Sequence, residues 1–190
     1  MLPGAGDPSG PGSARATRPR AVPRRLLLVL LGLSAVVAVA GGVVTVATAG
    51  GEEHAVTVRT PDGELIAQVP LDGDTFAVGY RNSIYTTLAE ERYRVLADGR
   101  FELVELAAEQ VAVLEEYYAV PGAPRPASPD DRLDFVVEPD PGRPAVFEEL
   151  NIAATDLGQR TLYVPGAEPV PIWELVVTDD PSVILDIEEN

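Results

Sequence analysis

Residues 54–81 read HAVTVRTPDGELIAQVPLDGDTFAVGYR, and this stretch decides the expected fold. Apolar and polar side chains alternate on both sides of residues 61–63, where proline presets its backbone angle and glycine accepts a positive φ. Two alternating runs joined by such a turn predict a β-hairpin. A second turn at residues 72–74 is followed by another alternating run, in which one face carries Phe76, Val78 and Tyr80.

Short alternating runs separated by Pro/Gly/Asp-rich turns continue to the end of the chain. This pattern is typical of a β-sandwich or a partly open β-barrel, so we predict a mainly β fold. Three segments are ambiguous. We expect residues 107–116 to continue as strand, although their apolar side chains also suit a helix. We expect residues 147–156 to hold a helical turn. Residues 172–178 are expected to form a strand.

An apolar run precedes the β-rich region. Leu26–Gly51 contains 26 residues and no charge, and about 20 apolar residues suffice to cross a bilayer as a helix. We therefore expect three parts: a disordered basic tail over residues 1–24, a transmembrane helix over residues 25–50, which meets membrane lipid through residues 26–49, and a β-rich domain over residues 51–190.

Charge gives the expected orientation of this anchor. Residues 1–25 hold five arginines and one aspartate, whereas residues 51–190 hold nine arginines and 29 acidic residues. The positive-inside rule then predicts a single-pass protein of the cell membrane with its N-terminus in the cytoplasm and its C-terminal domain extracytoplasmic. The alternative is a signal sequence cleaved near Ala49, which would release the domain as a secreted protein.

Composition excludes several classes of chemistry. The chain has no cysteine, no lysine and one histidine, His54. Thiol nucleophiles, disulfides, cysteine-based metal sites and Schiff-base chemistry are therefore ruled out within one chain. A net charge of −16 makes nucleic acid an unfavourable partner. We predict no cofactor, no metal, no catalytic residue and no enzymatic activity; a hydrolase using His54 and Ser83 is a weak alternative, because no nucleophile-elbow motif is present.

Carboxylates are abundant and often adjacent, as in Glu90-Glu91 and Asp130-Asp131. Neighbouring residues on a strand point to opposite faces, so these doublets are not themselves acid–base pairs, and we interpret them as a solvated acidic surface. No calcium-loop motif is present. Glu91 stands apart because it shares a face with Tyr93, so it is either a strand-end charge or part of a polar site, with Arg81 or Arg94 as its expected partner.

The run from Tyr80 to Tyr93 resembles the signature of the DUF1850 family, small exported bacterial and archaeal proteins of unknown function. The signature is approximately aromatic-x-His-Ser-Val/Ile, then a proline, then a glutamate. Asn82 stands at the usual histidine and Leu88 at the usual proline, while the matching residues are Tyr80, Ser83, Ile84, Glu91 and Tyr93. Residues 116–121 and 156–162 resemble later family segments more loosely, and Arg160 lies near a second histidine position.

The resemblance implies an accessory role beside tripartite (TRAP-type, TAXI class) solute transporters, with the permease or the solute-binding subunit as partner. We therefore expect an extracytoplasmic accessory or interaction domain, in which a polar patch is formed by Tyr80, Asn82, Ser83 and Glu91. The alternative is an exported module that binds a small ligand or calcium. Loss of the family's histidines is tolerated more easily by a binding role than by catalysis.

Overall fold

The computed structural model describes residues 44–45, 54–117, 122–177 and 180–189, and these residues confirm a mainly β fold with antiparallel sheets. The helical elements among these described residues are a π-helical turn at Val113–Tyr117 and the short helix α1, Ile172–Leu175. The strands are β1 Val44–Thr45, β2 His54–Arg59, β3 Leu65–Pro70, β4 Thr75–Arg81, β5 Leu88–Val95, β6 Phe101–Ala108, β7 Arg125–Pro126, β8 Phe135–Val137, β9 Val146–Phe147, β10 Glu149–Ala153, β11 Thr161–Tyr163, β12 Val170–Pro171 and β13 Ser182–Glu189.

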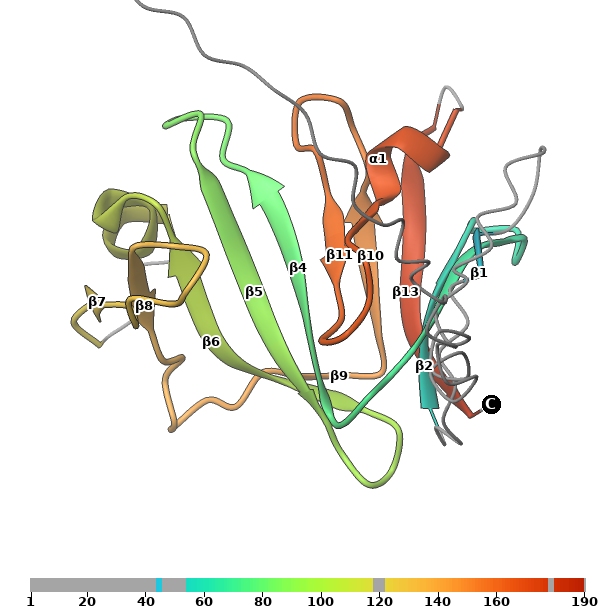
Figure 1. The fold of residues 1–190 in the computed structure, drawn as a ribbon, viewed down its shortest axis with the longest axis horizontal. Coiled ribbons are helices and arrows are strands. Elements are labelled where there is room, and N and C mark those ends of the chain that lie inside the picture. The colour runs from blue at the N-terminus through green and yellow to red at the C-terminus, as the bar shows by residue number, and fades with distance from the viewer. Residues whose placement is uncertain (1–43, 46–53, 118–121, 178–179, 190) are drawn as a thin grey trace, which may run out of the picture. The chain divides into compact units, whose positions relative to one another are not determined.

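The first sheet has the strand order β1-β3-β2-β13-β10. It contains the predicted hairpin, because β2 and β3 pair antiparallel with Thr57 opposite Gln68. Gly63 closes the turn with a φ of 89°, which glycine adopts without a Cβ clash. The C-terminal strand β13 then pairs with β2, so the two ends of the β-rich region meet in one sheet (Figure 1).

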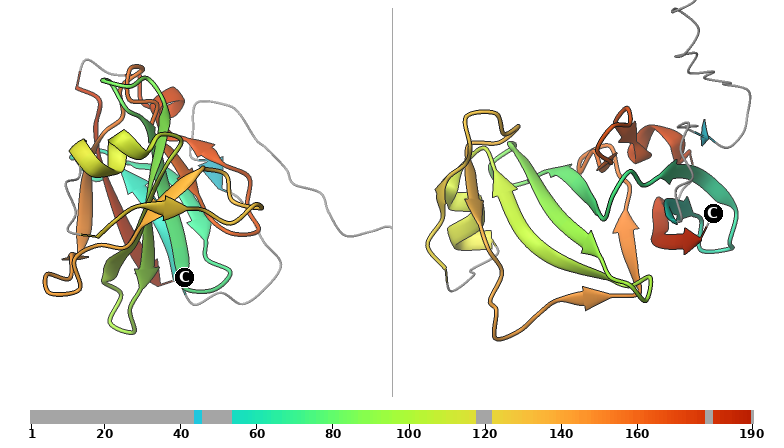
Figure 2. Two further views of the ribbon diagram at one scale, coloured as in Figure 1. Left: turned by 90° about the vertical axis from the view of Figure 1, so that its left-hand side faces the viewer. Right: turned by 60° about the horizontal axis from the view of Figure 1, so that its bottom comes forward.

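The second sheet has the order β12-β11-β4-β5-β6-β8-β7, and β9 pairs separately with one end of β6. Its long central strands β4, β5 and β6 are strongly bent, as Figure 2 shows. The edge strand β7 contains Pro126, which has no N–H to donate and therefore suits an edge.

The hydrophobic core lies between the two sheets. The first sheet contributes Val56, Val58 and Leu185, and the second contributes Phe76, Tyr93 and Phe101 among others. The predicted inward face of β4 is thus confirmed. Three of these rings pack together: Phe76 stacks on Tyr93 at 5.1 Å between centroids, and Phe101 meets Tyr93 edge-on at 5.5 Å.

Three expectations from the sequence are wrong. Strand β6 ends at Ala108, and Val113–Tyr117 turn helically, which buries the adjacent side chains of Val113 and Leu114 in an apolar cluster with Tyr80 and Leu106. Residues 147–156 hold β9 and β10 rather than a helical turn, since β13 supplies a complete antiparallel partner. Residues 172–175 form α1 rather than a strand, directly after Pro171.

Most of the predicted membrane anchor lies outside the described residues. Its two described members, Val44 and Thr45, form β1 and pair in parallel with Ala67 and Gln68 of β3. A helix through the apolar run therefore does not include these two positions. Within the part of the chain that the structure describes, no helix has both the length and the apolar character needed to span a membrane.

The outer face of the second sheet, opposite the core, is also covered. Ala77 and Gly79 of β4 are buried even though they point away from the core, and Tyr163 on the neighbouring strand lies over Gly79. A Cβ at residue 79 would come within 2.7 Å of Cε2 of Tyr163. Glycine at this position therefore lets the tyrosine ring lie close against the sheet.

Gly79→Ala should lower the free energy of unfolding by about 1–3 kcal/mol, because the Tyr163 ring must move to admit the new methyl group. Urea unfolding followed by circular dichroism measures this change. The cost should shrink in a Tyr163→Val background, where the obstructing ring is absent. An equal cost in both backgrounds would show that the close approach of the ring is not the cause.

Candidate functional site

The turn between β4 and β5, residues 82–87, is built around Asn82. Its side chain is buried, and its Oδ1 accepts hydrogen bonds from the backbone N–H groups of Ile84 at 3.0 Å and Tyr85 at 3.1 Å. Its own backbone N–H donates to the carbonyl of Thr87 at 2.8 Å. Thr86 has a φ of 56°, which is unusual for a β-branched residue. Asn82 therefore holds a tight, strained turn in place.

Two other loops lie at the same end of the fold, and backbone hydrogen bonds link the three in series. The backbone N–H of Arg81 donates to the carbonyl of Gly158 at 2.7 Å, which joins the turn to the β10–β11 loop, where Gln159 also has a positive φ. The N–H of Ala154 donates to the carbonyl of Pro181 at 2.8 Å, which joins that loop to the segment after α1. These loops lie at the top of Figure 1. We call the described parts of residues 82–88, 154–160 and 176–181 the loop end.

Large apolar side chains are exposed at the loop end. Ile84 is 69%, Leu157 76% and Val177 89% exposed, and Leu88 is 45% exposed. Among the described residues, one other large apolar side chain, Val146, is exposed to solvent in this way. Single exposed apolar residues are ordinary, but four of the five described ones lie on or beside the three loops at one end of the fold, and exposed apolar side chains are of the kind that proteins use for contacts.

At the base of the loop end, Arg160 links two of the predicted patch residues. Its guanidinium lies 4.3 Å above the ring centre of Tyr80, and its Nη1 lies 4.0 Å from Oε2 of Glu91. The hydroxyl of Tyr93 donates to the same oxygen of Glu91 at 3.0 Å. Burial, followed by the charge of Glu91, raises the pKa of Tyr93 above its usual value, so this tyrosine remains a donor.

The four predicted patch residues therefore fall into two pairs with different surroundings. Tyr80 and Glu91 meet through Arg160, whereas Asn82 supports the turn with its buried side chain and Ser83 is exposed on it. Glu91 lies in the middle of β5, not at a strand end.

The expected partners of Glu91 are engaged elsewhere. Arg81 donates to the carbonyl of Thr86, and Arg94 pairs with Glu102. The actual partner, Arg160, is 69 residues away in sequence, and its only signal was the loose resemblance of residues 156–162.

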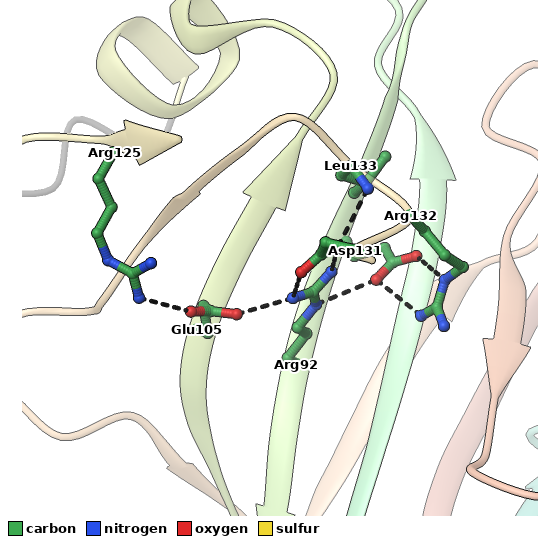
Figure 3. Close-up of polar contacts among 7 residues, drawn as sticks. Arg92, Glu105, Arg125, Asp131, Arg132 and Leu133 are labelled. Atoms are coloured by element: carbon green, nitrogen blue, oxygen red, sulfur yellow. Dashed lines mark hydrogen bonds and ion pairs between the residues drawn. The ribbon is translucent and has the colours of Figure 1, made fainter. Parts of the chain in front are cut away.

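A second polar cluster covers the outer face of the same sheet (Figure 3). Glu90 has a side chain that is only 5% exposed, and Arg132 donates to its two oxygens at 2.9 Å each. Arg92 donates to Glu90 at 3.2 Å, to Glu105 at 2.8 Å and to Asp131 at 2.5 Å. Arg125 completes the ion-pair cluster by donating to Glu105, so that three arginines face three carboxylates.

The ion-pair cluster ties the β7–β8 loop to the sheet. Arg132 stacks over the ring of Tyr163 at 4.4 Å, and the neighbouring Leu133 is buried against Ala107 and Val136. The doublet Asp130-Asp131 was expected to be solvated surface, but Asp131 is bound to Arg92 in this cluster. The doublet Glu90-Glu91 does point to opposite faces, as expected: Glu90 meets the ion-pair cluster and Glu91 meets Arg160.

His54 and Ser83, the residues considered for a hydrolase, lie in different parts of the fold. His54 begins β2 in the first sheet and pairs with Glu189, whereas Ser83 follows β4 of the second sheet. Within the described residues, no group of three or more His, Asp or Glu side chains is arranged to hold a metal ion.

Comparison with models of protein families, with curated proteins and with solved structures found no match to this chain. A functional assignment therefore depends on the residues and their geometry.

The stability of the ion-pair cluster should depend on pH. The hydrogen bond from Arg92 lowers the pKa of Asp131 to about 2, below the value of about 3.9 for a free aspartate. The resulting stabilisation is complete above pH ~4 and is lost as the pH falls toward about 2. Asp131→Asn should flatten the dependence of unfolding free energy on pH in this window, measured by urea unfolding, whereas the exposed control Asp62→Asn should not. Parallel curves for both variants would refute this assignment.

Proposed function

We propose that this chain is a membrane-anchored interaction domain, a β-sandwich displayed outside the cytoplasm whose loop end binds a protein partner in the same membrane. The single observation that carries the proposal is that exposed Ile84, Leu88, Leu157 and Val177 all lie on or beside the loops at one end of the fold, which backbone hydrogen bonds link. Exposed apolar groups cost solvation free energy, and a partner that covers them recovers it.

The strained turns support the same interpretation. Thr86 and Gln159 are the two non-glycine residues with positive φ in the described chain, and both belong to the loop end. Such strain costs of order 1 kcal/mol or more per residue and is commonly found at functional sites. The Arg160–Tyr80–Glu91 contacts brace these loops from below, so the apolar side chains are presented on a prearranged surface.

The charges around the patch indicate the chemistry of the partner. Asp156, Glu174 and Asp180 are exposed on or beside these loops. An anionic lipid surface would be repelled by them, whereas a protein with an apolar centre and a basic rim would be attracted. The resemblance to the DUF1850 family suggests that this partner is the permease or the solute-binding subunit of a TRAP-type transporter.

The proposed anchor is the apolar run before β1. Residues 26–43 comprise 18 uncharged residues, which as a helix would extend roughly 27 Å, close to the hydrocarbon thickness of about 30 Å. Cleavage near Ala49 would also remove β1, because Val44 and Thr45 precede that position. The pairing of β1 with β3 therefore favours an anchor that is retained.

The orientation is tested with reporter fusions after Asn190 and after Arg25. Alkaline phosphatase, which needs an oxidising compartment, should be active only in the fusion after Asn190, because the arginine-flanked end stays in the cytoplasm. Activity of the fusion after Arg25, or an inactive fusion after Asn190 that is expressed at the same level, would overturn the proposed topology.

Docking is tested in native membranes by placing a photo-crosslinking amino acid at Ser83, beside the patch, and identifying the adduct by mass spectrometry. The adduct should be a transporter subunit. The double change Ile84→Asp and Leu157→Asp should lower its yield about tenfold, because it places charges in the centre of the contact. The matched control Val146→Asp changes an exposed apolar residue away from the loop end and should leave the yield unchanged.

Equal yields from the double variant and the unchanged protein would refute docking at the loop end. An adduct with lipid alone would refute a protein partner. Circular dichroism of both variants verifies that the fold is intact, since all three positions are exposed.

A further inference from the structure

A cavity of about 790 Å³ opens on the outer face of the second sheet, beside the ion-pair cluster. Its floor is one row of register partners, Ala77 on β4, Arg92 on β5 and Glu105 on β6. One wall is formed by residues 130–132 of the β7–β8 loop and the other by residues 163–167 and Pro169. Pockets for small molecules usually occupy about 300–1,000 Å³, so the cavity has the size of a ligand site. No residue of the loop end lines it.

The second wall is apolar and largely rigid. Its lining includes Tyr163, Pro165, Ala167 and Pro169, and two of these are prolines with a fixed backbone angle. The ring of Tyr163 is held between Arg132 and the bare backbone of Gly79. A ligand that packs against this wall orders few side chains, so little conformational entropy is lost on binding.

The charges of the cavity are unbalanced. Its two arginines, Arg92 and Arg132, are already hydrogen-bonded to the three carboxylates of the ion-pair cluster. The cavity also contains Asp130 and Glu138, and no hydrogen bond or ion pair joins either side chain to another described residue. Negative charge without a counter-charge therefore remains on the lining.

An anionic ligand would be unfavourable here. Arg92 and Arg132 each already face carboxylates that compensate their charge, and drawing Arg132 away from Glu90 would leave a buried charge with less compensation. A cationic ligand meets Asp130 and Glu138, with which no other described residue pairs, and the field of the acidic region, with nine arginines against 29 acidic residues, attracts it from solution.

We infer that this cavity binds a small organic cation, an amine or quaternary ammonium carrying an apolar group. The apolar group packs against Tyr163 and the prolines, and the cationic group lies near Asp130 and Glu138. The site is separate from the loop end, so it does not depend on docking of a protein partner.

The test uses three probes with the same phenyl group and different charge: 2-phenylethylamine, 2-phenylethanol and 3-phenylpropionate. The full-length chain, purified in a mild detergent, is titrated with each probe by isothermal calorimetry. The amine should bind at least about tenfold more tightly than the alcohol, and the carboxylate more weakly still. Added salt should weaken binding of the amine, because its charge is attracted through partly exposed carboxylates.

A matched pair of double variants locates the site. Asp130→Asn with Glu138→Gln should weaken binding of the amine about tenfold, whereas Asp62→Asn with Glu64→Gln, on an exposed turn of the first sheet, should not. Absence of binding by all three probes, equal affinity for the amine and the carboxylate, or equal losses in both double variants would each overturn the inference. Circular dichroism checks that the four exposed substitutions leave the fold unchanged.

Discussion

The buried carboxylate of Glu90 is the constraint that organises the outer face of the second sheet. A charge taken out of water is strongly destabilising unless partners compensate it, and Glu90 is compensated by Arg92 from its own strand and by Arg132 from 42 residues away. Because Arg132 belongs to the β7–β8 loop, neutralising Glu90 also positions that loop. The loop then covers part of the sheet, and the cavity forms beside it.

The same loop position depends on an apolar contact and on an aromatic one. Leu133 packs against Ala107 and Val136, and Arg132 stacks on Tyr163, whose close approach requires glycine at residue 79. Ion pairs alone contribute little net stability when they are partly exposed, and replacing buried pairs with apolar residues is often neutral or stabilising. We interpret the ion-pair cluster as a device that selects one loop position, while burial of apolar side chains supplies most of the stability.

Adjacent residues of β5 serve two different surfaces. Glu90 points outward to the ion-pair cluster. Glu91 points to the other face, where it accepts a hydrogen bond from Tyr93 and pairs with Arg160 at the base of the loop end. One strand therefore connects the proposed ligand cavity with the proposed docking surface. The substitutions that test the two sites have no residue in common, so each site can be altered separately.

Local pattern determined the hairpin β2–β3, the inward face of β4 and the strand β13, because alternation with a period of two is a property of consecutive residues. It also predicted that Glu90 and Glu91 point in opposite directions.

Only the tertiary structure decided that Asn82 supports a turn, that Arg160 rather than Arg81 or Arg94 meets Glu91, and that Asp131 is bound to Arg92. Among the misassigned segments, residues 149–153 became strand β10 because β13, about 30 residues further on, supplies its antiparallel partner. Partners dozens of residues apart leave no periodic trace in a sequence, because their contact depends on how the sheets bring distant strands and loops together.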